Sequence, residues 1–162
     1  MRVVILCGIP GSGKSTYIIR RDGRLEKDPW ILGRKIVSAD HYFQTPYGYK
    51  FNPQDLPEAH NECLRQFNNV IFYGSVDPTR YSPGFVLVVD NTNTTIPEIA
   101  PYAALALAYG HTLEIITLLC DVDLAFKRCI HGVPRKSIEA MAKRLADREF
   151  PHWWNHRIVK VS

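Results

Sequence analysis

Residues 8–15 read Gly-Ile-Pro-Gly-Ser-Gly-Lys-Ser and directly follow the apolar run 2–7. Their spacing fits Gly-x-x-x-x-Gly-Lys-Ser, a loop whose backbone N–H groups close around a polyphosphate. Glycine permits the conformations that aim these groups inward, and bulkier residues would block the phosphate. Lys14 can reach the β- and γ-phosphates, and Ser15 can hold Mg²⁺. The pattern predicts a site for a nucleoside triphosphate, formed in this loop by Gly8, Pro10, Gly11, Ser12, Gly13, Lys14, Ser15 and Thr16.

Two aspartates end or follow other apolar runs, at positions where a parallel sheet binds its ligands. Asp40 is the candidate general base, because phosphoryl transfer needs a carboxylate that orients the attacking hydroxyl and accepts its proton. Asp90 is the candidate that positions Mg²⁺, directly or through water. For both, the alternative is a turn residue at a strand end. Asn91 and Asn93 are expected to shape the loop through side-chain-to-backbone hydrogen bonds.

Arginines are the candidates for stabilising the transferring phosphoryl group from the opposite side. Arg128 and Arg135 flank a Gly-Val-Pro segment that breaks a helical pattern, which is typical of a mobile lid over about 128–137. Exposed surface arginines are the alternative for both. The sequence does not place Arg144 or Arg148.

The elements that must position these residues alternate between strand-like and helical patterns. Apolar runs predict strands at 2–7, 35–38, 85–89 and 113–119. Helical patterns are expected at 14–21, 53–71 and 95–109, with further helices capped by Asp123 and Ser137. This order predicts an α/β fold with a mostly parallel central sheet flanked by helices. Segments 43–53 and 74–84 are expected to form loops over the mouth of the sheet.

Length and composition indicate one globular domain over residues 1–162. The apolar share is 46% and the charged share 22%, and no apolar run approaches the length of a membrane span. Met1 leads straight into the first strand rather than into a signal segment, so a cytoplasmic location is expected. The four cysteines lie far apart, which favours reduced thiols in the core.

Charge and aromatic residues leave the acceptor of a phosphoryl group open. The net charge is +4, but residues 126–162 carry nine Lys and Arg against three Asp and Glu. This region is either a solvated helix face or a surface that binds phosphates or nucleic acid. Segment 42–51 interleaves aromatic residues with Lys50 and could stack the bases of a nucleic-acid end, or simply pack under a loop. Trp153 and Trp154 more often anchor a chain terminus than line a ligand site.

With these residues placed, the chain resembles the 5′-hydroxyl polynucleotide kinase group of P-loop phosphotransferases, and most of all the NEDD4-binding-protein-2-like kinase domains. The similarity spans most of the chain, and the ordered set of motifs is more specific than the phosphate loop alone. The motifs are Gly8-Ile9-Pro10-Gly11-Ser12-Gly13-Lys14-Ser15, Ser38-Ala39-Asp40-His41-Tyr42-Phe43, Tyr49-Lys50-Phe51 with Leu56-Pro57-Glu58-Ala59-His60, Asp90-Asn91-Thr92-Asn93, and Arg128-x-x-His131-Gly132-Val133-Pro134.

The resemblance implies a P-loop kinase fold with a small lid, in which Asp40 is the general base and Arg128 grips the donor phosphates. Relatives of this group carry an arginine three residues after the base, directed at a phosphate of the acceptor strand, and here that position is Phe43. The expected activity is transfer of the γ-phosphate of ATP, with Mg²⁺, to a 5′-OH end of RNA or DNA. Two alternatives remain open: a kinase of a nucleoside, sugar or other small metabolite, and a non-catalytic ATP-binding switch module.

Overall fold

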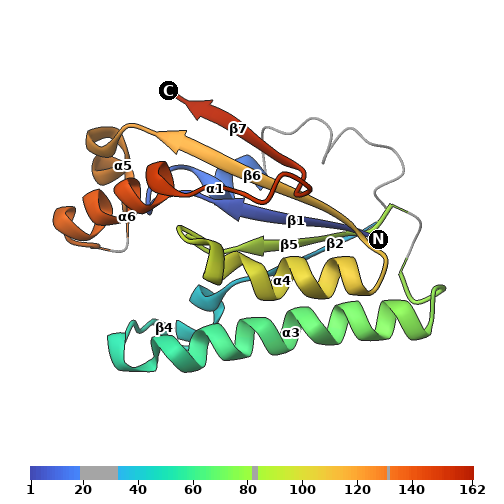
Figure 1. Ribbon diagram of the computed structural model, residues 1–162. Helices are drawn as coiled ribbons and strands as arrows, with labels where there is room; N and C mark the ends of the chain where they lie inside the picture. Colours follow the sequence, from blue (N-terminus) through green and yellow to red (C-terminus); the bar gives the residue numbers. More distant parts are fainter. Residues whose placement is uncertain (19–32, 82–83, 131) are drawn as a thin grey trace.

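Five parallel strands form the central sheet of the protein (Figure 1). The computed structural model describes residues 1–18, 33–81, 84–130 and 132–162. The spatial order of the strands is β2-β5-β1-β6-β7, and every neighbouring pair is parallel. Their bounds are β1 Arg2–Cys7, β2 Arg34–Val37, β5 Val86–Asp90, β6 Thr112–Cys120 and β7 His156–Val161. The α/β fold with a mostly parallel sheet is therefore confirmed.

Helices cover the sheet and its carboxyl edge. Helices α3 and α4 lie together on one face, while α5 and α6 lie toward the end at which the strand arrows point (Figure 1). The helices are α1 Lys14–Thr16, α3 Leu56–Val76, α4 Ile96–Ala108, α5 Val122–Arg128 and α6 Arg135–Asp147, with short 3₁₀ turns η2 Ala39–Phe43 and η3 Pro53–Asp55. The helix expected at 14–21 is described only up to residue 18, and its remainder lies outside the described residues.

The strands are apolar on both sides because both faces of the sheet are covered. In β1, Val3 and Ile5 point toward α3 and α4, where they join a core that includes Phe67 and Ile99. The alternate residues Val4 and Leu6 point to the other face and pack against Ile18. Alternation along a strand thus divides one apolar run between two cores. This burial fixes β1, and with it the loop that follows.

Local signals set the ends of α4. Thr95 is its N-cap, and the Thr95 and Glu98 side chains form a capping box with the backbone of the first turn. Gly110, with φ of 72°, follows the C-cap in the left-handed conformation that favours glycine. Both boundary signals predicted from the sequence are confirmed.

Two predicted helix caps are wrong, one by two residues and the other by three. The N-cap of α5 is Asp121, whose side chain accepts hydrogen bonds from the N–H groups of Asp123 and Leu124, so Asp123 lies in the first turn. Helix α6 begins at Arg135 instead of after Ser137, because the Pro134 carbonyl already accepts from the next turn. In both places a residue slightly earlier in the chain supplies the oxygen that the first N–H groups require.

The expectation for segment 74–84 is also wrong. Helix α3 continues to Val76 and ends where Asp77 precedes Pro78, a context that disfavours helical backbone. Gly74, Tyr81 and Gly84 line a cavity of about 420 Å³ with Met1, at the edge where β1 begins rather than at the mouth of the sheet.

The sequence does not predict strand β7, because Arg157 and Lys160 fall in the basic region 126–162, for which a solvated helix face and a phosphate- or nucleic-acid-binding surface are the two alternatives. In the structure Arg157 donates hydrogen bonds to Glu114, at 2.6 Å, and to the hydroxyl of Tyr17, at 2.7 Å. A strand at the edge of a sheet accommodates such charged side chains. Segment 43–53 also contains an antiparallel hairpin of β3 Gln44–Thr45 and β4 Gly48–Tyr49, which the sequence did not predict.

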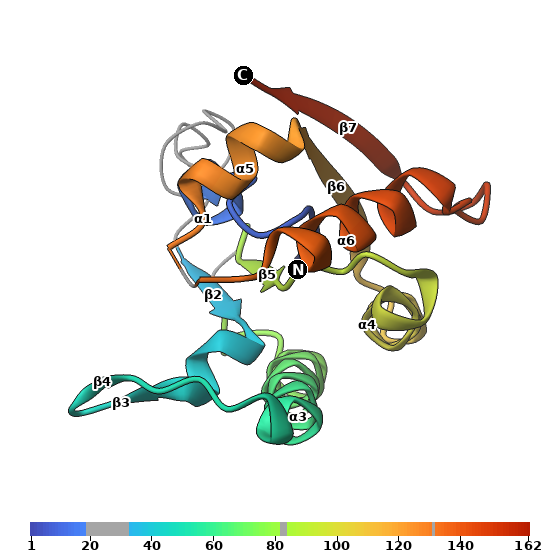
Figure 2. The ribbon, with the colours of Figure 1, turned by 90° about the vertical axis from the view of Figure 1, so that its left-hand side faces the viewer.

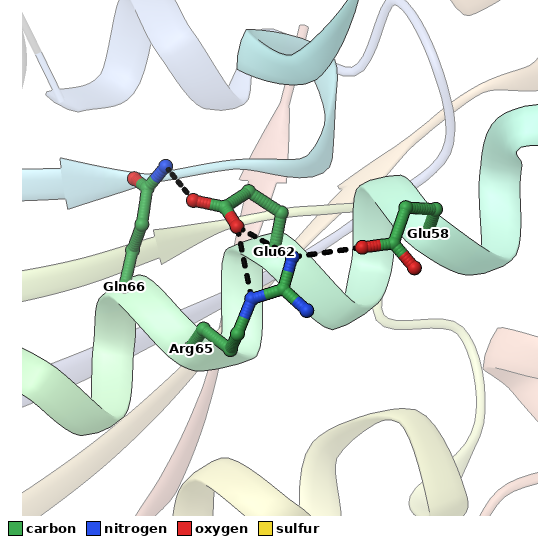
Figure 3. Close-up of polar contacts among 4 residues, drawn as sticks. All are labelled: Glu58, Glu62, Arg65 and Gln66. Atoms are coloured by element: carbon green, nitrogen blue, oxygen red, sulfur yellow. Dashed lines mark hydrogen bonds and ion pairs between the residues drawn. The ribbon is translucent and has the colours of Figure 1, made fainter.

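The outer face of α3 carries a network of charged side chains (Figure 3). Arg65 bonds to Glu58 at 2.8 Å and to Glu62 at 2.7 Å, and Gln66 donates to Glu62 at 3.0 Å. The side chains of Arg65, Glu58 and Glu62 are accessible to solvent, so their ion pairs contribute little to stability. They show which side of α3 faces solvent, opposite the buried side that carries Phe67. None of the helices in the described parts of the chain is long and apolar enough to cross a membrane.

Two glycines of the phosphate loop differ in what surrounds them. Both have positive φ, 77° for Gly11 and 87° for Gly13. A Cβ at Gly11 would lie 2.0 Å from the carbonyl oxygen of Ala125 in α5, whereas a Cβ at Gly13 would meet nothing within 4 Å. Helix α5 therefore packs directly on the backbone of the loop at Gly11.

We predict that Gly13→Ala lowers the free energy of unfolding by about 1–2 kcal/mol, the cost of left-handed backbone for alanine. Gly11→Ala carries the same strain and must also displace α5, so it should cost about 2–5 kcal/mol. Urea unfolding of the nucleotide-free proteins measures both values. Equal losses in the two variants would contradict the close packing of α5 on the loop.

Candidate active site

A cleft of about 1200 Å³ opens at the carboxyl end of the sheet. Seen toward this end, α5 and α6 lie on one side of the phosphate loop, and η2, the β3–β4 hairpin and α3 lie on another (Figure 2). The cleft is lined by loop residues that include Lys14 and Ser15, by Asp40 and Asp90, and by residues of the surrounding elements. Parallel pairing makes this convergence possible, because Leu6 of β1 is in register with Asp90 of β5.

The predicted phosphate-loop residues divide into two layers. Pro10, Gly11, Gly13, Lys14, Ser15 and Thr16 line the cleft. Gly8 and Ser12 are buried beneath it, and a Cβ at Gly8 would lie 2.6 Å from Oγ of Ser12. Ser12 Oγ has no hydrogen-bond partner among the described residues. The glycines thus leave room for backbone to surround an anion, as this type of loop does.

Lys14 lies across the loop. Its Nζ donates hydrogen bonds to the carbonyls of Gly8, at 3.0 Å, and Ile9, at 3.3 Å. Burial lowers the pKa of Lys14, while the carboxylates of Asp90 and Asp40 act in the opposite direction. The ammonium group therefore sits within a poorly solvated loop, where it can act strongly on a bound anion.

Ser15 and Asp90 meet at the cleft. The hydroxyl of Ser15 donates to Oδ2 of Asp90 at 3.1 Å. Burial raises the pKa of Asp90, and Lys14 and the Ser15 hydrogen bond oppose that shift. The described residues include no cluster of three or more His, Cys, Asp or Glu side chains suited to a metal ion. A hydroxyl beside one carboxylate nevertheless fits Mg²⁺, which commonly uses one or two protein oxygens together with water and substrate phosphates.

The loop after β5 ties three strand ends together. Asn91 Oδ1 accepts from the N–H of Ala39 at 2.8 Å, and Asn93 Nδ2 donates to the Leu6 carbonyl at 2.7 Å. Ser38 Oγ donates to the Asp90 carbonyl at 2.7 Å. The predicted side-chain-to-backbone hydrogen bonds of Asn91 and Asn93 are confirmed, and their partners lie at the ends of the neighbouring strands. Asn93 also has φ of 45°, a left-handed conformation that asparagine tolerates better than most residues.

Asp40 lies on the 3₁₀ turn η2 directly after β2. Ser38 caps the turn, because its side chain accepts a hydrogen bond from the Asp40 N–H at 3.2 Å. The Asp40 carboxylate is exposed to the cleft, and its Oδ1 accepts a hydrogen bond from the hydroxyl of Tyr49 at 3.3 Å. Capping is thus carried out by Ser38, which leaves the Asp40 carboxylate facing the cleft. The interaction with Tyr49 was not foreseen from the sequence.

The two arginines predicted from the lid differ in placement. Arg128, at the end of α5, lines the cleft, and its Nη2 lies 3.5 Å from the Ser162 carbonyl. Arg135 is absent from the described lining of the cleft and forms ion pairs with Asp123, at 2.5 Å, and Glu139, at 2.8 Å. Of the proposed lid 128–137, His131 lies outside the described residues.

Two further arginines, which the sequence could not place, lie near the loop after β5. Arg144 lines the cleft, and its Nε donates to Thr94 Oγ1 at 3.1 Å. Arg148 donates to the Asn93 carbonyl at 2.6 Å and also bonds to Thr117 Oγ1. Arg144 is exposed, whereas Arg148 is half-buried and supports the loop from behind. The position of Arg144 on the helix face that carries Met141, another lining residue, was the available signal.

On the opposite side the cleft is lined by Tyr49 and Phe51 from the hairpin region, together with Leu56 and His60 from α3. The placement of segment 43–53 at the mouth of the sheet is therefore confirmed. Phe43, by contrast, is 3% exposed and packs inside. The chain thus presents a polar phosphate loop between arginines on one side and aromatic rings on the other, an arrangement suited to phosphoryl transfer between two bound substrates.

Sequence comparison with known proteins identifies the family to which this chain belongs. AAA_33, described as an AAA domain, matches residues 3–147. NEDD4-binding protein 2 from Homo sapiens is 32% identical over 145 residues, which is 86% of this chain. This chain spans only 7% of the length of that protein.

Solved structures show the same fold. Kti12 from Chaetomium thermophilum, in complex with ADP-AlF3, has a TM-score of 0.61 at 14% identity, over 99% of this chain and 88% of that chain. The APS kinase CysC from Mycobacterium tuberculosis, in complex with AMPPNP and APS, has a TM-score of 0.56 at 15% identity, over 98% and 87% respectively. The phosphate loop, the parallel sheet and the family match over most of the sequence lead to one conclusion: the chain belongs to the AAA_33 family of AAA domains, with a P-loop kinase-like fold.

Proposed function

We propose that this protein is an ATP- and Mg²⁺-dependent kinase that transfers the γ-phosphate to a 5′-OH end of RNA or DNA. The observation that carries the proposal is that Asp40 and the phosphate loop line the same cleft. A module that only binds ATP has no need of a carboxylate at this place, so Asp40 supports catalysis over a switch function. The similarity to NEDD4-binding protein 2 and the basic region 126–162 favour a nucleic-acid acceptor.

In this proposal the loop residues hold the triphosphate, and Lys14 neutralises charge at the β- and γ-phosphates. Ser15 and Asp90 would hold Mg²⁺, which supplies further charge neutralisation at the phosphates. Asp40 accepts the proton of the acceptor's 5′-OH while the oxygen of that hydroxyl bonds to the γ-phosphorus. The bond between the γ-phosphorus and the β–γ bridging oxygen breaks, and ADP leaves. Arg128 and Arg135 are the proposed cations on the transferring group, and Arg135 must leave its two carboxylate partners to act.

A small-molecule acceptor is the second candidate, favoured by the likeness of the fold to kinases of small substrates. Incubation with γ-labelled ATP and a panel of 5′-OH oligonucleotides, nucleosides, sugars and other alcohols separates the two. Label on the oligonucleotides supports the proposal. Label found only on a small alcohol would support the small-molecule kinase. ATP binding without any phosphoryl transfer would favour the switch module.

We predict that Lys14→Ala reduces the rate of phosphoryl transfer by about 10³-fold or more, because the variant loses the cation at the β–γ bridge. Initial rates with labelled ATP measure the loss, and thermal unfolding verifies that the variant is folded. Lys35→Ala, at an exposed lysine of β2 outside the described lining of the cleft, is the matched control and should keep its rate. Near-normal turnover of folded Lys14→Ala would refute the kinase proposal.

Asp40→Asn should lower kcat by about 10²–10⁴-fold and leave the affinity for ATP unchanged, since asparagine keeps the shape but cannot accept the proton. Steady-state kinetics and calorimetric titration with a non-hydrolysable ATP analogue measure the two quantities. Asp55→Asn, on η3 and outside the described cleft lining, serves as control. If the affinity for the analogue falls together with kcat, Asp40 belongs to the nucleotide site instead.

The two lid arginines give a comparison within one region. Arg128→Ala should reduce kcat by about 10³-fold, on the scale of other arginines that contact a transferring phosphoryl group. Arg135→Ala should cost less, because its guanidinium first has to leave Asp123 and Glu139. Rates at saturating ATP decide the order. A larger loss for Arg135→Ala would mean that the α5–α6 connection rearranges during the reaction.

A further inference from the structure

The wall of the cleft beside Asp40, on the side of the hairpin, is formed mainly by aromatic side chains, and we call it the aromatic wall. Tyr49, Phe51, Leu56 and His60 contribute to it, beside Asp40 itself. Tyr49 is 39% exposed and Phe51 50% exposed, so both rings present open surface at the cleft. The proposed roles of the loop and of Asp40 use none of these four side chains.

Phe43 holds the two rings in place. Its own ring is 3% exposed, and its centroid lies 5.0 Å from that of Phe51 and 6.1 Å from that of Tyr49, both in edge-to-face geometry. Aromatic pairs in this arrangement are attractive beyond the area that they bury. The backbone adds a tie, because the Lys50 N–H donates to the Phe43 carbonyl at 2.9 Å. The aromatic wall is thus anchored in the core next to η2.

Charge decides which part of an acceptor this wall can bind. Asp40 contributes a carboxylate beside this wall, whose four residues include no lysine or arginine. The nearby Lys50 ammonium lies over the ring of Tyr47, 5.9 Å from its centroid. A phosphate of the acceptor would meet the Asp40 carboxylate here, whereas a nucleobase would meet two aromatic rings.

We propose that Tyr49 and Phe51 bind the terminal nucleobase of the acceptor by stacking, and that the Tyr49 hydroxyl positions Asp40. This inference rests on the proposed polynucleotide kinase function. The hydroxyl lies 3.3 Å from Asp40 Oδ1. Burial and the Asp40 carboxylate raise the pKa of Tyr49 to about 12, so the phenol stays protonated and remains a donor at neutral pH. Tyr49 would then have two roles: its ring would bind the base, and its hydroxyl would orient the Asp40 carboxylate.

The test compares two 5′-OH oligonucleotides that differ only at the 5′ residue, which carries either a base or an abasic tetrahydrofuran. In the wild-type protein KM should be about fivefold or more higher for the abasic strand, the change expected from loss of one stacked base. Tyr49→Leu should raise KM for the strand with the base and abolish this difference. Tyr47→Leu is the matched control, because Tyr47 is on the same hairpin, 89% exposed and outside the described cleft lining.

The hydroxyl is tested by Tyr49→Phe, which keeps the ring. This variant should retain KM and the discrimination against the abasic strand, while kcat falls about tenfold. A merely structural role would not separate kcat from KM in this way. Titration with an ATP analogue should give wild-type affinity for each variant, and if Tyr49→Leu does not fold, Phe51→Leu replaces it.

Equal KM for the two strands in the wild-type protein would overturn the stacking proposal, as would full discrimination in folded Tyr49→Leu. Unchanged kcat in Tyr49→Phe would overturn the positioning role. Each of these results presupposes that oligonucleotides are phosphorylated. If no oligonucleotide is labelled at all, the proposed function itself fails, and this inference fails with it.

Discussion

The parallel pairing of β1 with β5 and β6 is the constraint on which the site depends. Parallel strands bring their carboxyl ends to one edge, and here Leu6 is in register with Asp90 and Cys7 with Thr117. Because both faces of β1 are buried, a shift of register would move its apolar residues out of two cores at once. The burial of β1 therefore also fixes the phosphate loop relative to Asp90.

Electrostatics at this edge follow from the same burial. Desolvation lowers the pKa of Lys14 and raises that of Asp90, and each charge opposes the shift of the other. A cation and a carboxylate are thus held together where water screens them poorly. Such a place suits a polyphosphate with its metal ion, because the phosphates meet the Lys14 ammonium and the metal ion meets the Asp90 carboxylate, both already oriented.

The cleft has two sides with different chemistry. Arg128 reaches it from α5, which packs on the phosphate loop where Ala125 meets Gly11, and Arg144 reaches it from α6. The other side is built on η2 and the hairpin, where Phe43 supports aromatic rings. Cations on one side suit phosphates and aromatic rings on the other suit planar groups, so the two sides of the cleft differ in the chemistry that they offer to a ligand.

The sequence by itself determined the elements whose signals are local. The phosphate loop, the four apolar strands and the capping box of α4 depend on nearby residues. The type of Asn91 and Asn93 indicated side-chain-to-backbone bonds, but their partners Ala39 and Leu6 lie on other strand ends and are set by the sheet. Strand β7 depends instead on pairing with β6, and only the tertiary structure shows that Arg157 meets Glu114 there. The positions of Arg144 and Arg148 likewise follow from packing between elements far apart in the chain. Side-chain contacts between residues far apart in the chain produce no periodic pattern in the sequence. They become visible only in the tertiary structure, where the sheet brings its strand ends together.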